Sequence, residues 1–107
     1  MRIEFRQEGG FAHLLGLSKP IVVDTTQMPD QQARELERLV ETACFFELPP
    51  QAWALPRGVA DVRRYTVTIE HAGRRHTVQL TDLVDDPAPQ ALLDQLRGMA
   101  HEQRARH

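Results

Sequence analysis

The chain of 107 residues has a single cysteine, Cys44, and no long run of apolar residues. One cysteine cannot form an internal disulfide, and the start MRIEFRQ lacks the apolar segment of a signal peptide. No stretch approaches the roughly 18 consecutive apolar residues that a membrane-spanning helix needs. We therefore expect a protein of the reducing cytoplasm with no membrane partner.

The sequence also lacks an excess of charge of one sign and is poor in aromatic residues. It has 13 Lys and Arg against 15 Asp and Glu, a formal net charge of -2, and only 6% of Phe, Trp and Tyr. Such a balance gives no field that would attract nucleic acid or anionic lipid, and single-strand binding needs aromatic side chains on which bases can stack. We expect no nucleic-acid partner.

A complete catalytic or metal-binding motif is missing as well. His101 and Glu102 begin like the helix motif of zinc peptidases, but Ala105 stands where the second histidine would be. His71 and His76 flank a predicted turn and are expected to point to opposite faces, which would prevent shared coordination. Cys44 is expected to pack in the core. We therefore expect no enzyme activity, no cofactor, no catalytic residue and no metal site.

The first half of the chain predicts two strands and a helix. In MRIEFR the residues Ile3 and Phe5 alternate with charged residues, and IVVDT after Pro20 is rich in β-branched residues. These two strands are expected to pair antiparallel, with residues 8–19 as the tip of a wide hairpin. Apolar residues at helical spacing predict an amphipathic helix from Pro29 to about Cys44, with an inward face of Leu36, Leu39, Val40 and Ala43. The following FFELPP ends it, and its apolar residues are expected under the sheet.

The second half predicts a hairpin and a second helix. Alternation in YTVTIEHAGRRHTVQL around the turn Ala72-Gly73 predicts the pairs Tyr65 with Leu80, Val67 with Val78, Ile69 with His76 and Glu70 with Arg75. Residues 89–103 predict a helix whose inward residues are Leu92, Leu93, Leu96, Met99 and Ala100.

Together these elements predict the fold class α+β: a four-stranded antiparallel sheet with two helices packed on one face. A chain of this length forms one modest core, so residues 1–107 are expected to be a single domain. The tail, about residues 103–107, is expected to fray.

Several motifs in this order resemble the emfourin family, whose members are small protein inhibitors of protealysin- and thermolysin-like zinc metallopeptidases. The resemblance rests on MRIEF, the GGFA after it, the DT that closes the second strand, ELERLVE, FFELP and the hairpin YTVTIEHAGRRHTVQLTD. It covers nearly the whole chain. It implies the same fold, no catalytic activity, and a metallopeptidase of this class as the partner.

The resemblance also implies a contact surface at the hairpin tip, formed by Gly9, Gly10, Phe11, Ala12 and His13. Peptidases of this class bind an extended chain in a cleft and prefer a bulky apolar side chain after the scissile bond. Two glycines allow a close backbone approach, and Phe11 offers an apolar anchor. The alternative is that Phe11 covers one end of the core while the glycines serve a turn.

The only tryptophan, Trp53, lies in the proline-flanked stretch PPQAWALP. It is a possible secondary contact, because tryptophan is enriched among the residues that dominate interfaces. The alternative, which we favour, is a lid over the seam between helix and sheet, because a loop of this length needs an anchor of its own. A different class of function also stays open: a non-catalytic interaction module that binds another cytoplasmic protein through its sheet face or edge.

Overall fold

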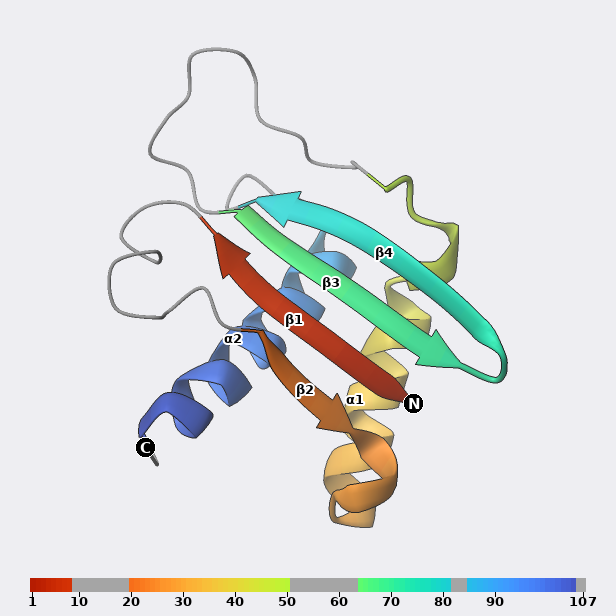
Figure 1. The fold of residues 1–107 in the computed structure, drawn as a ribbon. Helices are drawn as coiled ribbons and strands as arrows, with labels where there is room; N and C mark the ends of the chain where they lie inside the picture. Colours follow the sequence, from red (N-terminus) through yellow and green to blue (C-terminus); the bar gives the residue numbers. More distant parts are fainter. Residues whose placement is uncertain (9–19, 51–63, 82–84, 106–107) are drawn as a thin grey trace.

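The computed structural model describes residues 1–8, 20–50, 64–81 and 85–105. Four strands and two helices follow one another with two short 3-10 turns (Figure 1). The elements are β1 Arg2–Glu8, β2 Ile21–Asp24, η1 Thr25–Gln27, α1 Asp30–Thr42, η2 Phe45–Glu47, β3 Arg64–His71, β4 Arg74–Thr81 and α2 Pro87–Ala105. Neither helix in this part of the chain is long and apolar enough to cross a membrane.

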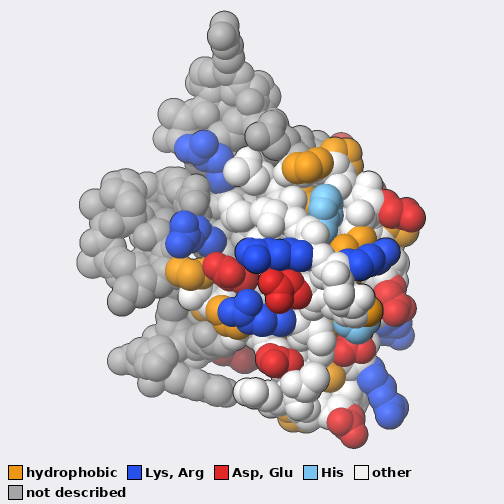
Figure 2. Space-filling model, turned by 45° about the vertical axis from the view of Figure 1, so that its right-hand side comes forward, with side chains coloured by type: hydrophobic (Ala, Val, Ile, Leu, Met, Phe, Trp, Pro, Cys, Tyr) orange, Lys and Arg blue, Asp and Glu red, His pale blue; other side chains and the backbone are white. Residues whose placement is uncertain are grey.

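The strands form one sheet in the order β2-β1-β3-β4, and every neighbouring pair is antiparallel. Both helices cover the same face of this sheet, as Figure 1 shows. The predicted fold class is therefore confirmed. The other face carries no helix among the described residues, and acidic and basic side chains lie next to each other on the surface in Figure 2.

The core lies between the sheet and the two helices. Its sheet layer comes from the alternating apolar residues of all four strands, and its helix layer from the apolar stripes of α1 and α2. Leu36 and Val40 of α1 are buried, whereas Leu39 is only partly so. The buried residues on the described part of α2 are Pro89, Leu92, Leu93, Leu96 and Ala100, with Met99 partly buried against them.

The hairpin of β3 and β4 has the predicted register throughout, including Tyr65 with Leu80 and Ile69 with His76. Its two turn residues, Ala72 and Gly73, have φ of 53° and 80°. Both angles are positive, as a two-residue type I′ turn requires, so the turn matches the right-handed twist of the strands. The turn is thus compatible with the register in which the sixteen residues of the two strands pair.

The end of α1 corrects one prediction. Cys44 is exposed rather than packed in the core. It has a left-handed backbone with φ of 52°, and its N–H donates to the carbonyl of Glu41 as the helix ends. The chain reverses direction at this residue, so that the next one, Phe45, enters the core while the thiol stays outside.

The prediction for the two histidines of the hairpin was wrong in part. His71 is exposed and His76 is half-buried, as expected, but they do not point to opposite faces. His76 pairs with Ile69, and His71 follows Ile69 by two residues, so both histidines lie on the helix-covered side. Among the described residues no group of three or more His, Cys, Asp or Glu lies close enough together to hold a metal ion.

Candidate functional site

All six predicted contact residues, namely Gly9, Gly10, Phe11, Ala12, His13 and Trp53, lie outside the described residues. What the structure does define is the set of positions at which the chain enters and leaves their segments. These positions fall at one end of the sheet.

That end of the sheet is formed by three strand termini in a row. Glu8, the last residue of β1, is paired with Arg64, the first residue of β3, and Arg64 is paired with Thr81, the last residue of β4. We call this row the Glu8 end (Figure 1). The chain leaves it at Glu8 toward residues 9–19, arrives at Arg64 from residues 51–63, and leaves it again at Thr81 toward residues 82–84. Segments far apart in the sequence are thus attached side by side.

Behind the Glu8 end lies a stacked and buried aromatic pair. The rings of Phe5 and Tyr65 stack with 5.7 Å between centroids and an interplanar angle of 13°, and both residues are buried. Arg97 of α2 holds its guanidinium carbon 5.8 Å from the Tyr65 ring centroid. Stacked aromatic rings add to the stability given by burial, so this end of the sheet is a firm base for whatever the chain carries beyond it.

The other entrance to residues 51–63 is fixed through β4. Pro50, the last described residue before that segment, accepts a hydrogen bond of 2.7 Å from the backbone N–H of Gln79. Two residues earlier, the carbonyl oxygen of Leu48 lies 2.7 Å from Nε2 of His76. The segment that follows η2 therefore runs along the outer edge of β4 and delivers the chain close to Thr81.

An aromatic cluster holds η2 in this place. Phe45 meets Phe46 and His76 edge to face, at centroid distances of 5.8 and 5.6 Å. The guanidinium of Arg74 lies over the Phe46 ring, 4.3 Å from its centroid. The sequence predicted the apolar residues of FFELP in this region but missed the roles of His76 and Arg74. Both side chains contact a segment 28 residues away in the sequence, and no local pattern marks such a contact.

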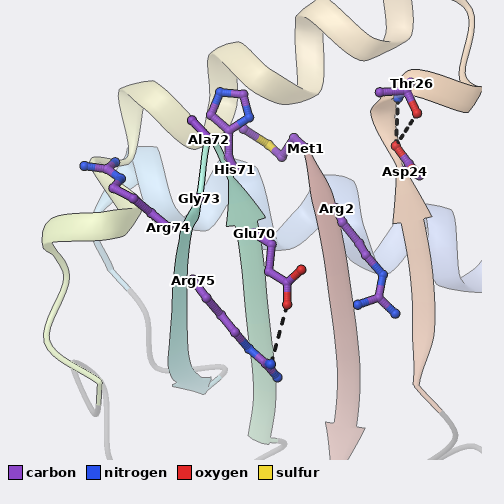
Figure 3. A pocket seen from close by; sticks show the side chains of 10 residues that line it. All are labelled: Met1, Arg2, Asp24, Thr26, Glu70, His71, Ala72, Gly73, Arg74 and Arg75. Atoms are coloured by element: carbon purple, nitrogen blue, oxygen red, sulfur yellow. Dashed lines mark hydrogen bonds and ion pairs between the residues drawn. The ribbon is translucent and has the colours of Figure 1, made fainter.

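The opposite end of the sheet has a shallow hollow of about 410 Å³ near the turn Ala72-Gly73. Figure 3 shows that its three arginine side chains, Arg2, Arg74 and Arg75, point in different directions and do not converge on one position. Arg75 instead pairs with Glu70 across the hairpin at 3.5 Å, between two exposed side chains. Such a pair contributes little. The hollow therefore lacks the geometry of an anion site.

One carboxylate in this hollow is held by its own strand end. Asp24 accepts hydrogen bonds from the backbone N–H and the hydroxyl of Thr26, at 2.9 and 2.6 Å. These two bonds, first that of the hydroxyl, lower the pKa of Asp24 below its usual value of 3.8. The residue caps η1 and stays ionised, which is a structural task and not that of a general acid.

Across this end of the sheet, charges of opposite sign alternate from strand to strand. The register places Asp24, Arg2, Glu70 and Arg75 in one row. Alternation cancels the field of each charge at a distance, which agrees with the absence of a single-sign patch on the described part of the face in Figure 2. Nothing in this row favours a polyanionic partner.

Comparison with known proteins gives one clear finding. Residues 5–97 match the family model described as Emfourin. No curated protein and no solved structure matches the chain. The matched range includes the second half of β1, all of β2, α1, η2 and the β3–β4 hairpin, and the first half of α2, which build and support the Glu8 end. The chain therefore belongs to the Emfourin family.

Proposed function

We propose that the protein is a reversible inhibitor of thermolysin- and protealysin-like zinc metallopeptidases, acting by occlusion of the active-site cleft. Membership of the Emfourin family supports the inhibitor role. The observation that carries the proposal further is the pairing of Glu8 with Arg64 and of Arg64 with Thr81. It attaches the segment that contains Gly9–His13 and the one that contains Trp53 to the same end of a firm sheet.

In this proposal the residues beyond Glu8 are the inhibitory contact. Gly9 and Gly10 permit close approach of the backbone to the cleft, Phe11 supplies an apolar anchor, and Ala12 and His13 complete the contact. Trp53 is a secondary contact. Attachment to paired strands lowers the entropy lost when these residues are ordered on the enzyme.

The protein contributes no catalytic group and no cofactor in this mechanism, and it acts in the cytoplasm. Inhibition follows from exclusion of the substrate from the cleft. Binding is reversible because no covalent bond forms between the two proteins.

A second candidate function is a non-catalytic module that binds another cytoplasmic protein through the sheet. It is favoured by the sheet face that no described helix covers, shown in Figure 2. The two candidates differ in which residues bind. Cleft occlusion uses residues next to the Glu8 end, whereas sheet binding uses outward residues such as Thr66, Thr68 and Gln79 in the middle of the strands.

The test is a titration of the purified protein against a thermolysin- or protealysin-like enzyme, with peptide hydrolysis as the readout and added Zn²⁺ to exclude simple chelation. A serine peptidase assayed with the same peptide is the specificity control. The proposal is supported if metallopeptidase activity is lost stoichiometrically while the serine peptidase keeps its activity. Full activity of several such enzymes at micromolar protein would refute it and leave the sheet-binding module.

A further inference from the structure

The two outer strands of the sheet differ in how their free edges are treated. On β4, the segment 48–50 covers part of the edge, because Gln79 donates its N–H to the carbonyl of Pro50. On β2, no described residue pairs with the side that faces away from β1. An open strand edge presents unpaired N–H and C=O groups and is a template for pairing with another chain.

The register shows which backbone groups β2 presents. Thr25 donates its N–H to the carbonyl of Met1 at 2.9 Å, and this pair continues the register of Arg2 with Asp24. Hydrogen-bonded and non-hydrogen-bonded pairs alternate along an antiparallel ladder, so Val23 is bonded to β1 and Val22 is not. The N–H and C=O of Val22, and the N–H of Asp24, therefore point away from the sheet.

The same alternation holds along β4. The two-residue turn makes His71 and Arg74 a hydrogen-bonded pair, and alternation then leaves the N–H of Gln79 pointing outward. That N–H is the one bound by Pro50. The alternation thus accounts for the bond between Gln79 and Pro50 at the β4 edge, and it predicts the outward backbone groups of Val22 and Asp24 at the β2 edge.

The side chains at the β2 edge also favour contact. Val22 has 45% of its surface exposed, and among the described residues it is the one large hydrophobic residue in the exposed class. The carboxylate of Asp24 does not cover the free backbone groups of β2, because it is hydrogen-bonded to Thr26 further along its own chain.

We propose that β2 pairs with β2 of a second copy of this chain, antiparallel and centred on Val22, to form a continuous eight-stranded sheet in a weak homodimer. Val22 of each copy exchanges N–H and C=O bonds with Val22 of the other, and the N–H of each Asp24 donates to the carbonyl of the opposite Pro20. Pro20 has no N–H to offer, but in this register only its carbonyl is needed.

A second copy fits this edge because it is complementary to itself. In the register centred on Val22, Val23 lies opposite Ile21 on the core side and Val22 opposite Val22 on the outer side, while Asp24 lies opposite the uncharged Pro20. No like charges face each other directly. A register shifted to pair Val22 with Asp24 would need the Asp24 carbonyl, which as the N-cap of η1 already serves that turn.

The assembly stops at two copies. The interface has two-fold symmetry and uses the free edge of β2 in both copies, while the β4 edges carry the 48–50 segment. Because β2 has only four residues, the buried area falls short of that of stable complexes. The dimer therefore forms at high protein concentration. The two Glu8 ends point in opposite directions, so the proposal does not depend on the proposed inhibitory function.

The test is sedimentation velocity on the full chain from low micromolar to millimolar concentration, combined with backbone NMR over the same range. We expect a concentration-dependent dimer whose shift changes centre on Val22 and Asp24. Val22→Lys, which places two positive charges opposite each other, is expected to raise the dimer dissociation constant at least about tenfold. Thr77→Lys is the matched control: the same new charge, on an exposed outward position of β4, with an unchanged constant.

Three results would overturn the proposal. The first is a protein that stays monomeric at millimolar concentration, and the second is dimerisation that Val22→Lys and Thr77→Lys affect equally. The third is a set of shift changes located away from β2, for example on the outer residues of β3 and β4. A cooperative thermal transition in each variant shows that folding is intact, and the NMR map of the unchanged protein tests the interface without any substitution.

Discussion

Nε2 of His76 and the carbonyl oxygen of Leu48 lie 2.7 Å apart, 28 residues from each other in the sequence. This bond ties the turn after α1 to the edge strand β4. The half-buried ring also meets Phe45 edge to face, so one side chain joins a polar and an apolar contact.

Removal of this imidazole should cost stability. His76→Leu keeps the apolar contact but leaves the Leu48 carbonyl without its partner, so the free energy of unfolding should fall by about 1 to 3 kcal/mol. Urea unfolding followed by circular dichroism measures it. His71→Leu is the matched control, because His71 is exposed, and should stay within about 0.5 kcal/mol of the parent. Equal losses in both variants would show that the bond contributes nothing of its own.

Two glycines with open space around them should respond to alanine in opposite ways. A Cβ added at Gly73 or at Gly98 meets no atom within 4 Å, so the backbone alone decides. Gly73 has φ of 80°, and Gly73→Ala should destabilise the protein by about 1 to 2 kcal/mol. Gly98 lies inside α2, and Gly98→Ala should stabilise it by about 0.5 to 1 kcal/mol. Thermal unfolding of both variants measures these effects. Shifts of the two melting temperatures in the same direction would contradict this account.

Patterns of local spacing were sufficient to predict the sheet and helices. Alternation set the register of β3 with β4, and the helical spacing of Leu36 and Val40 gave the buried face of α1. Both are properties of neighbouring residues. The position of Cys44 was wrong because one residue with positive φ reverses the chain, and a cysteine gives no sign of it as a glycine would.

The candidate site was predictable in part. The sequence marked GGFA as a projection from the first hairpin, but it could not place Arg64 beside Glu8. That pairing depends on β3 entering the sheet between β1 and β4, a choice made by tertiary packing of two distant hairpins. The binding of Leu48 by His76 belongs to the same class of long-range contact.

The reversed chain at Cys44 leads to a prediction of its own. Because the side chain is exposed and φ is 52°, Cys44→Gly should relieve left-handed strain and raise the free energy of unfolding by about 0.5 to 1 kcal/mol. Cys44→Ala keeps the strain and should change stability little. Chemical denaturation of both variants distinguishes this from a core cysteine, for which both changes would destabilise.

The acid-dependent stability of the η1 turn should depend on Asp24. Its pKa is lowered by the bonds from Thr26, so the folded state binds its proton less readily than the unfolded state does. This contribution to stability is fully present above the usual pKa of 3.8 and is lost as the pH falls through the lower pKa of the folded state. NMR titration of the Asp24 carboxyl should show a pKa below 3.8 in the parent and a higher one in Thr26→Val. An equal pKa in the two proteins would remove the Thr26 hydroxyl as a cause.

The proposed inhibitory contact gives the most direct prediction. If Phe11 is an anchor in the peptidase cleft, Phe11→Ala should weaken inhibition by well over tenfold, which corresponds to about 2 kcal/mol or more, with little change in melting temperature. Inhibition constants and thermal melts of the same preparations measure both quantities. The matched control is Phe5→Leu, a change in the buried stack with Tyr65, which should lower the melting temperature while the folded protein still inhibits. A joint loss of inhibition and stability in Phe11→Ala would instead assign Phe11 to the core and leave the remaining residues of GGFAH as the contact to be mapped.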